Sequence, residues 1–263
     1  MSSEKQRIDI LLVERGAALT RELARRYIMA GEVSVNGQVI DKPGTRVPAD
    51  AHITLRAAPR FVSRGGEKLA AALDTFKIAV EGAICADVGA STGGFTDCLL
   101  QRGAAKIYAL DVGYGQLDYR LRTDERIVVM ERTNARYVEA LPERPTFVCV
   151  DASFISLRLL LPVIRGWLPA RAGIVTLIKP QFEAGRQDVG KNGVVKDAAI
   201  HRRVVAEILS AAQGEGFAVR GLIPSPLIGP AGNKEFLAWL VWGEGESLDM
   251  AAAIAEAIPE NTG

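Results

Sequence analysis

The segment of residues 85–97 contains an apolar run, a turn rich in glycine and the start of a helical pattern, in that order. The apolar run ends in Asp87, and Gly89, Gly93 and Gly94 follow within the next seven residues. Residues 95–100 then have the spacing of a helix. A strand, a tight turn and a helix in this order form the first unit of a nucleotide-binding α/β domain. This segment therefore favours a Rossmann-like sheet in the larger part of the chain.

The turn differs from two common phosphate-binding motifs. Ser91 occupies the place of the middle glycine of a dinucleotide fingerprint, and no Gly-Lys-Ser/Thr sequence of a P-loop follows. Gly89, Gly93 and Gly94 let the main chain approach a ligand closely. Asp87 leaves a carboxylate at the carboxyl end of the strand, where open α/β sheets bind ligands. The pattern favours a cradle for S-adenosylmethionine; the alternative is a turn whose glycines serve only helix–strand packing.

A second short apolar run, residues 106–112, also contains an acidic residue at its end. Asp111 follows Asp87 by 24 residues, and an acid at the end of the second strand is where such folds hold a ribose diol. Two acids at successive strand ends therefore indicate an adenosine ligand. Alternatively, Asp111 caps a strand or starts a turn, because Gly113 and Gly115 are close by.

The length of 263 residues, with 48% hydrophobic and 24% charged side chains, suits one large globular domain and a small one. Strands are expected near residues 83–88, 106–111, 127–131, 147–151, 173–179, 217–223 and 236–242. Helices are expected near residues 63–77, 93–102, 154–165 and 197–213. This alternation predicts an α/β fold with a parallel sheet and helices on both of its faces.

The N-terminal part has the pattern of a small α+β unit. A short helical pattern begins near Ile8, and Thr20 is a good N-cap for a second helix over residues 21–30. Asn36-Gly37 lies between two short apolar strands, which predicts a hairpin with a type I′ turn. A last short strand is expected at residues 52–55.

Arginine is concentrated on the second helix of this N-terminal part. Arg21 and Arg25 are one turn apart and share a helix face, with Arg26 beside them. Residues 1–60 contain ten Lys and Arg against seven Asp and Glu, whereas the formal net charge of the whole chain is only +1. The face is a candidate for contact with RNA phosphates, and the alternative is an ordinary solvated helix face.

Composition places the boundaries between the parts. We expect a small domain at residues 1–59, a linker at 60–64, a large domain at 65–245 and a loosely attached C-terminal tail at 246–263. Residues 181–196 contain several glycines and charges and are expected to form a mobile loop near the ligand edge of the sheet.

The three cysteines, Cys85, Cys98 and Cys149, lie in apolar runs without metal-ligand spacing, so we expect no metal site. No signal peptide and no apolar run of about 18 residues is present, which predicts a cytoplasmic protein without a membrane span.

Two further strands end in residues that can do chemistry. Asp151 ends the run at residues 148–151, and Lys179 ends the run at residues 175–179. Lysine is rarely buried without a partner, and burial beside another cation favours its neutral amine, which can accept a proton from a hydroxyl group. Lys68 lies before the sheet and Glu235 precedes the last strand. The alternative for Lys179 is a surface lysine at a strand tip.

The N-terminal part resembles an S4 domain, the small RNA-binding module of ribosomal protein S4, pseudouridine synthases and tyrosyl-tRNA synthetases. The resemblance is carried by residues 7–12, by the arginine-bearing residues 20–28 and by the hairpin sequence Gly-Glu-Val-Ser-Val-Asn-Gly at residues 31–37. It implies RNA binding through Arg7, Arg21, Arg25 and Arg26.

The large domain resembles the FtsJ-like RNA 2′-O-methyltransferases. Lys68, Asp151, Lys179 and Glu235 match the Lys-Asp-Lys-Glu tetrad of that family, and residues 87–95 match its Asp-x-Gly-x-x-x-Gly-Gly-Phe loop. Together with the S4-like part, residues 7–242 resemble the TlyA family, also called hemolysin A. The most specific segments are residues 63–69, 87–95, 151–156 and 178–183.

The resemblance implies an S-adenosylmethionine-dependent enzyme that methylates the ribose 2′-hydroxyl of a cytidine in ribosomal RNA, with ribosomal RNA or ribosomal subunits as partners. It implies that Lys179 is the general base, that Lys68 holds the hydroxyl or a phosphate, and that Asp151 and Glu235 orient the two amines. Arg64 joins the arginines expected to bind RNA. The residues implied to bind the cofactor are Asp87, Gly89, Ala90, Ser91, Gly93, Phe95, Asp111, Val112, Thr133, Asn134 and Asp151.

Three other functions remain open from the sequence. A membrane-active hemolysin would match the older family name, but no long apolar segment or basic amphipathic helix supports it. A non-catalytic RNA-binding protein is disfavoured because all four tetrad residues are present. A methyltransferase for small molecules would leave the S4-like part without a purpose. The sequence does not specify the oligomeric state.

Overall fold

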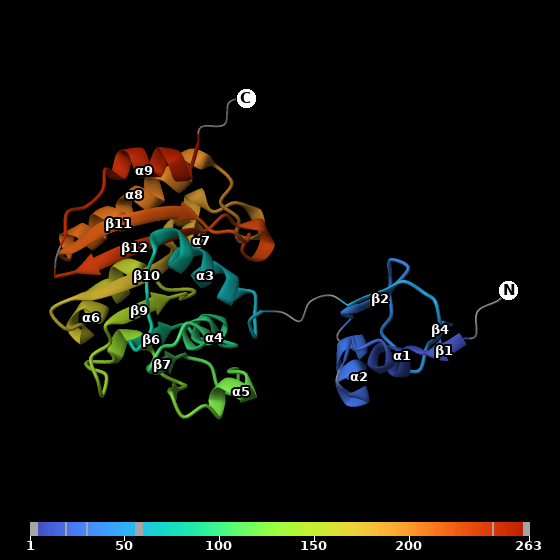
Figure 1. Cartoon of the computed structure of the whole chain (residues 1–263). Coiled ribbons are helices and arrows are strands. Elements are labelled where there is room, and N and C mark those ends of the chain that lie inside the picture. The colour runs from blue at the N-terminus through green and yellow to red at the C-terminus, as the bar shows by residue number, and fades with distance from the viewer. Residues whose placement is uncertain (1–4, 19, 30, 56–59, 244, 260–263) are drawn as a thin grey trace. The chain divides into compact units, whose positions relative to one another are not determined.

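The computed structural model describes residues 5–18, 20–29, 31–55, 60–243 and 245–259. The chain divides into two compact units, Met1–Arg60 and Phe61–Gly263, which Figure 1 shows with their elements labelled. Each unit has its own hydrophobic core, so each is described by itself.

The first unit is a small α+β fold whose local signals behave as expected. Thr20 Oγ1 accepts a hydrogen bond from the Leu23 N–H, as an N-cap does. Asn36 and Gly37 have φ angles of 50° and 83°, which confirms the type I′ turn. Its elements are β1 (Lys5–Arg7), α1 (Ile8–Glu14), α2 (Arg21–Met29), β2 (Val33–Val35), β3 (Gln38–Val39), β4 (Arg46–Pro48) and β5 (Ile53–Leu55).

The second unit is built on a seven-stranded sheet with the order β11-β12-β10-β9-β6-β7-β8. The strands from β10 to β8 are parallel, but β12 runs antiparallel to both of its neighbours. The expectation of a parallel sheet was therefore wrong for this edge. Its strands are β6 (Ile84–Val88), β7 (Lys106–Leu110), β8 (Ile127–Met130), β9 (Phe147–Val150), β10 (Ala172–Ile178), β11 (Phe217–Pro224) and β12 (Phe236–Trp242). A loop with one short 3-10 turn connects β11 to β12, so the chain reverses and the two strands pair as neighbours.

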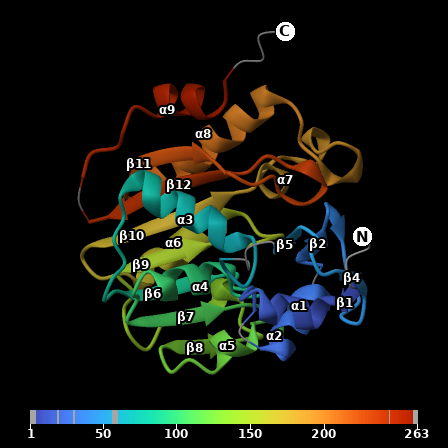
Figure 2. The ribbon, with the colours of Figure 1, turned by 45° about the vertical axis from the view of Figure 1, so that its right-hand side comes forward.

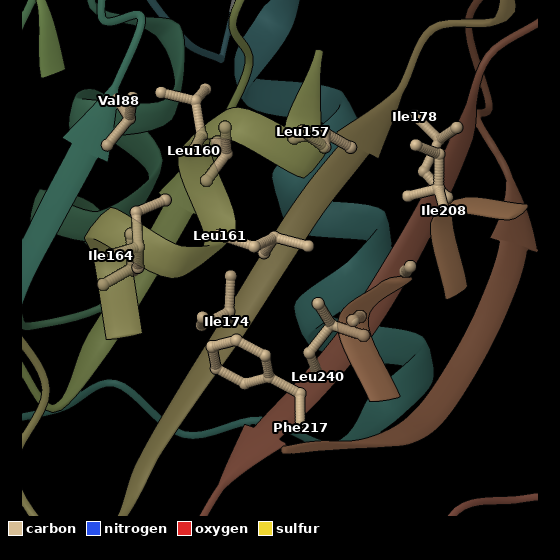
Figure 3. Packing of buried hydrophobic residues seen from close by; sticks show 14 of the residues in the cluster. Val88, Leu157, Leu160, Leu161, Ile164, Ile174, Ile178, Ile208, Phe217 and Leu240 are labelled. Carbon is tan, nitrogen blue, oxygen red and sulfur yellow. The ribbon is translucent and has the colours of Figure 1, made fainter. Parts of the chain in front are cut away.

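Helices cover both faces of this sheet (Figures 1 and 2). Residues of α3, α4 and α5 pack on one face, and residues of α6, α8 and α9 pack on the other. Figure 3 shows the second face, where Leu161 and Ile164 meet strand residues such as Ile174 and Leu240. The helices are α3 (Gly65–Phe76), α4 (Gly94–Gln101), α5 (Tyr119–Arg122), α6 (Leu157–Trp167), α7 (Pro180–Glu183), α8 (Ala198–Gly214) and α9 (Met250–Ala257). The short 3-10 turns are Ala135–Tyr137, Arg186–Asp188, Lys191–Gly193 and Pro230–Gly232.

Residues 61–64, expected to lie in a linker, are instead part of the second unit. Phe61 is buried in the core beside α3 and α4. Its ring occupies the space that a side chain at Gly66 would need, since a Cβ there would lie 2.2 Å from the ring. The Val62 N–H donates to Asp97 Oδ2 at 2.8 Å. Residues 56–59, before this point, lie outside the described residues.

The C-terminal segment also differs from the expectation of a loosely attached tail. Ile254, Ala257 and Ile258 are buried in the core that α6 and α8 share. The Leu248 N–H donates to the Val219 carbonyl at 2.8 Å, which joins the segment to β11. The buried apolar residues of α9 pack against α8 and β11, and this packing holds the segment to the sheet.

Residues 184–196, within the region expected to be a mobile loop, contain two short 3-10 turns, and residues 181–183 of that region belong to α7. Asn233 ties this segment to the loop before β12, because its side chain accepts from the Val195 N–H and donates to the Gly193 carbonyl. The mobility of the segment stays a prediction.

Candidate active site

The site begins where the strand order reverses, between β6 and β9. Ligands of open α/β sheets bind at the carboxyl ends of strands at such a point. Gly89 follows β6 with a φ of 90°, and a Cβ added to it would lie 2.6 Å from the Asp151 carbonyl oxygen. Only glycine therefore fits at this position, because the ends of β6 and β9 are in contact with each other here.

Two neighbouring cavities open at this edge. The first, of about 300 Å³, is lined by seven of the expected cofactor residues. Those residues are Gly89, Ser91, Asp111, Val112, Thr133, Asn134 and Asp151. Gln116, Ile155 and Leu160 also line it, although the sequence did not single them out.

The second cavity, of about 270 Å³, lies beside the first and shares Gly89, Ser91 and Asp151 with it. It also brings together Ala90 and Phe95 from the glycine turn with Arg64 and Lys68 at the start of α3. The combined space lies in the range of small-molecule sites. The first cavity is suited to a nucleoside, and the second lies next to residues that can transfer a proton.

Asp111 organises the main chain on both sides of the first cavity. Its Oδ2 accepts the Ser91 N–H at 2.7 Å, and its Oδ1 accepts the Gly113 N–H at 2.6 Å. The carboxylate therefore joins the turn after β6 to the turn after β7. Each carboxylate oxygen can accept a further hydrogen bond, so these bonds leave acceptor capacity for hydroxyl groups of a ligand.

Asp87 and Gly93 line neither cavity, although both were expected to bind the cofactor. Asp87 is fully buried, and its Oδ2 accepts the Thr96 hydroxyl at 2.6 Å. Gly93 has a φ of 98°, and a Cβ there would lie 2.3 Å from Leu121 Cδ1. Both residues therefore shape the glycine turn from the side on which it packs against α4 and α5.

Burial raises the pKa of the Asp87 carboxyl to about 7 from 3.8, although the Thr96 hydrogen bond works in the opposite direction and the charge of Asp151 raises it further. A carboxyl whose pKa is raised by folding stabilises the protein below its unfolded pKa, and this contribution is lost as the pH rises toward the folded pKa. We expect the free energy of unfolding of the ligand-free protein to fall by about 3 kcal/mol through this group between pH 4 and 7. Asp87→Asn should flatten this pH dependence in chemical denaturation, and an unchanged slope would contradict it.

The four tetrad residues form two ion pairs at this edge. Lys179, at the end of β10, places its Nζ 2.5 Å from Asp151 Oδ1. Lys68, near the start of α3, places its Nζ 2.5 Å from Glu235 Oε2. The side chains of Lys179, Lys68 and Glu235 are at most 11% exposed, so both pairs are shielded from water.

The loop before β12 encloses the Glu235 carboxylate. The Gln181 side-chain amide donates to Glu235 Oε1 at 3.4 Å. Gly229 packs so closely that a Cβ on it would lie 2.3 Å from the same oxygen. Gln181 is two residues after Lys179 and thus connects the two ion pairs, and neither Gln181 nor Gly229 was given a role from the sequence.

Sequence reasoning also gave no role to three residues beside Lys179, which are Ser153, Phe154 and Phe182. Its Nζ donates to Ser153 Oγ at 2.9 Å. Phe154 is 90% exposed with a φ of 63°, and its ring lies 4.8 Å from that of Phe182. These residues lie in segments that carry the family resemblance, but their exposure was not predicted, because an aromatic residue after an apolar strand usually belongs to a core.

The arginines expected to bind RNA differ in their surroundings. In the first unit, Arg7 Nε and Arg21 Nε lie 3.0 and 2.9 Å from the carboxylate of Asp9, which is fully buried. The Arg7 hydrogen bond and the Arg21 guanidinium hold the pKa of Asp9 below its usual value, against the effect of burial. Arg25 and Arg26 are exposed on α2. In the second unit, Arg64 is exposed and lines the second cavity.

Within the described part of the chain, no helix is long and apolar enough to cross a membrane. The described residues also contain no group of three or more potential metal ligands.

Comparison with known proteins places the chain in a family. The model of the FtsJ-like methyltransferases matches residues 61–242, and the model of the S4 domain matches residues 6–53. YqxC of Bacillus subtilis is 51% identical over 94% of this chain and 89% of that protein. The Mycobacterium tuberculosis protein named 16S/23S rRNA (cytidine-2′-O)-methyltransferase TlyA is 47% identical over 90% of each chain.

A solved structure from Streptococcus thermophilus that bears the name hemolysin is similar over most of its length. It has a TM-score of 0.74 and 43% identity, and covers 96% of this chain and 95% of that one. The family name hemolysin and the name rRNA methyltransferase thus occur among similar proteins. By its S4 domain, its methyltransferase fold and these relatives, the chain belongs to the TlyA family of FtsJ-like methyltransferases.

Proposed function

We propose that the protein transfers a methyl group from S-adenosylmethionine to the ribose 2′-hydroxyl of a cytidine in ribosomal RNA. The observation that carries this proposal is the pair of shielded lysine–carboxylate contacts beside two neighbouring cavities at the carboxyl edge of the sheet. The relative TlyA is named for this reaction on 16S and 23S rRNA. The S4 domain supplies a second reason to expect an RNA substrate.

The volumes of the two cavities and the polar groups that line them suit the cofactor. Asp111 would take the ribose hydroxyls, and Asn134 or Thr133 the adenine edge. Gly89, Ala90, Ser91 and Phe95 would line the methionine end, where the lack of a side chain at Gly89 gives the main chain its close approach. When bound, S-adenosylmethionine supplies an electrophilic methyl group on its sulfonium.

The residues of the chain are proposed to remove one proton, that of the ribose 2′-hydroxyl. After its ammonium releases a proton to solvent, the Lys179 amine would accept the proton of the ribose 2′-hydroxyl, the oxygen to which the methyl group is transferred. Asp151 holds the Lys179 Nζ in place and balances its charge after the transfer. The Lys68 ammonium, held by Glu235, stabilises the negative charge that develops on the oxygen. The residues thus contribute alignment and electrostatics to a reaction whose leaving group is already activated.

Exposed aromatic and basic side chains near the cavities give the RNA a place to bind. Phe154 lies at the first cavity, almost fully exposed. Tyr114, which is 68% exposed, follows β7, and the Arg132 guanidinium lies 4.2 Å from its ring centre. Aromatic rings beside cationic groups suit single-stranded or unstacked nucleotides. Arg64 adds a positive charge at the second cavity.

We expect Asp111→Ala to weaken S-adenosylmethionine binding by about 1–3 kcal/mol, or roughly 5- to 150-fold. The change removes the acceptor for the ribose hydroxyls and also frees the Ser91 and Gly113 N–H groups. Isothermal calorimetry with S-adenosylmethionine measures the effect, and circular dichroism checks that the fold is kept. An unchanged affinity would remove Asp111 from the cofactor site.

RNA affinity should depend more on Arg25 and Arg26 than on arginines elsewhere. Replacing both with alanine should weaken RNA binding and reduce the log–log salt slope by up to about two, since two phosphate contacts are lost. Arg102→Ala with Arg126→Ala is the matched control, because it removes two charges from outside the cavity edge, each paired with an acidic residue. Equal effects of the two double variants, measured by filter binding at several salt concentrations, would show a general charge effect only.

The proposed function is tested by methyl transfer from labelled S-adenosylmethionine to isolated ribosomal subunits and to free ribosomal RNA. We expect label in at least one of these RNAs and binding of S-adenosylmethionine, not of NAD, in calorimetry. Tight NAD binding without S-adenosylmethionine binding would contradict the proposal. Lysis of erythrocytes by the pure protein, undiminished in Lys179→Ala and without methyl transfer, would instead favour a hemolysin.

A further inference from the structure

Glu183, at the end of α7, uses both of its carboxylate oxygens on the start of another helix. Its Oε1 accepts the Leu157 N–H at 2.8 Å, and its Oε2 accepts the Ser156 hydroxyl at 2.6 Å. Leu157 is the first residue of α6 and Ser156 is its N-cap. Glu183 thus satisfies the free N–H of a helix that begins far from it in the sequence.

This contact joins the two chain segments that hold the proposed base and its partner. Asp151 begins the segment between β9 and α6, and Lys179 begins the segment that Glu183 ends. The paired residues of β9 and β10 end at Val150 and Thr176, before either side chain is reached. Beyond these two residues, side-chain contacts connect the two segments. The contact made by Glu183 lies at the end of the segment that begins with Lys179.

The segment that Glu183 secures contains an unfavourable backbone conformation. Phe154 has a φ of 63°, in the left-handed region that a bulky residue rarely adopts. Its neighbour Ser153 accepts from Lys179, and Ser156 and Leu157 donate to Glu183. A strained residue persists only where its surroundings fix it, and these contacts flank Phe154 on both sides.

We infer that Glu183 is a positioning residue that keeps Asp151, Ser153 and Phe154 in register with Lys179; this inference rests on the proposed function. Without the carboxylate, the segment after β9 can relax its backbone and move away from α7. Lys179 then loses the geometry of its contacts with Asp151 and Ser153. The methyl transfer step suffers more than cofactor binding, because binding also rests on Gly89, Ser91 and Asp111, which Glu183 does not contact, whereas the proton transfer depends on the Lys179–Asp151 geometry.

A carboxyl group near the site is also compatible with a different role, in which Glu183 itself acts as an acid or base on the substrate. Burial raises the pKa of Glu183, whereas the bonds from Leu157 and Ser156 lower it. Both oxygens, however, are directed at the α6 terminus, and Glu183 lines neither of the two cavities. The geometry therefore favours support of the segment over contact with the reacting atoms.

The test compares Glu183→Ala and Glu183→Gln with Asp249→Ala. Asp249 is the matched control, because its carboxylate also caps a helix, α9, by accepting the Ala251 and Ala252 N–H groups. For each variant we would measure kcat, the KM for RNA, the affinity for S-adenosylmethionine and the melting temperature. Glutamine keeps an oxygen for the Leu157 N–H, and its amide can donate to Ser156, whose hydroxyl then acts as acceptor.

We expect Glu183→Ala to lower kcat about 30- to 100-fold, as a small misplacement of reacting groups does, with cofactor affinity within about threefold of wild type. Glu183→Gln should retain kcat within about threefold, and Asp249→Ala should retain it fully. If Glu183→Ala does not fold, Ser156→Ala removes one of the two bonds and should lower kcat several-fold, while Glu183→Gln should not.

Three results would overturn the inference. The first is wild-type kcat in Glu183→Ala, or in Ser156→Ala if that variant replaces it. The second is a loss of kcat in Asp249→Ala that matches the loss in Glu183→Ala, which would mean general destabilisation. The third is folded but inactive Glu183→Gln, which would mean direct acid–base action. Lys179→Ala measured in parallel separates these results from failure of the proposed function, because an active Lys179→Ala would refute the site itself.

Discussion

Lys179→Ala is expected to lower the rate of methyl transfer by about 10²- to 10⁴-fold, the range for loss of a general base. The amine lies at the end of β10, shielded from water and in contact with Asp151 and Ser153. Alanine leaves the strand intact but removes the group that accepts the hydroxyl proton. Single-turnover methyl transfer with saturating cofactor measures the change.

The affinity for S-adenosylmethionine distinguishes a catalytic role of Lys179 from a role in cofactor binding. Lys179→Ala should bind S-adenosylmethionine within a few-fold of wild type, since the residue lines neither cavity. Lys191→Ala, which removes an exposed lysine from a neighbouring segment, should leave the rate unchanged. Near-normal turnover in Lys179→Ala would exclude Lys179 as the base, and lost cofactor affinity would assign it to the binding site instead.

Lys68→Met is expected to lower the free energy of unfolding by about 3–5 kcal/mol, because it leaves the Glu235 carboxylate buried without its counter-ion. The Glu235 side chain is fully buried and that of Lys68 only 11% exposed. Lys68→Met combined with Glu235→Leu should recover most of the stability, since an apolar pair of similar size replaces the ion pair. Methyl transfer should stay low in both variants.

The exposed pair of Arg165 and Glu215 provides the control for this experiment. Their side chains are 43% and 31% exposed, and exposed pairs contribute less than about 1 kcal/mol. Arg165→Met should therefore change urea unfolding very little. If Lys68→Met is no more destabilising than Arg165→Met, the Lys68–Glu235 pair does not stabilise the site. Full activity of the apolar double variant would exclude both residues from catalysis.

Much of the site's location was predictable from strand ends. Asp111, Asp151 and Lys179 each follow a short apolar run, and the carboxyl ends of parallel strands meet at one edge. The order of elements in the second unit and the hairpin of the first unit follow from periodicity and turn chemistry. The family, its S4 domain and its methyltransferase fold are confirmed.

Other features depend on packing that the sequence does not display. Asp87 looks like a ligand residue at a strand end, yet its side chain accepts the Thr96 hydroxyl and lines neither cavity. Asp9 looks like an ordinary helix residue, yet it binds the two arginines Arg7 and Arg21. The direction of β12 and the attachment of α9 depend on contacts between segments distant along the chain. A one-dimensional pattern contains no information on which of these contacts form.

The most direct test of the central claim is the chemical position of the transferred methyl group. Ribosomal subunits are treated with labelled S-adenosylmethionine and either wild-type protein or Lys179→Ala, and the RNA is digested to nucleosides for mass spectrometry. We predict label in 2′-O-methylcytidine with the wild-type protein and almost none with Lys179→Ala. Label on the cytosine base, or equal labelling by both proteins, would contradict transfer to a ribose hydroxyl with Lys179 as its base.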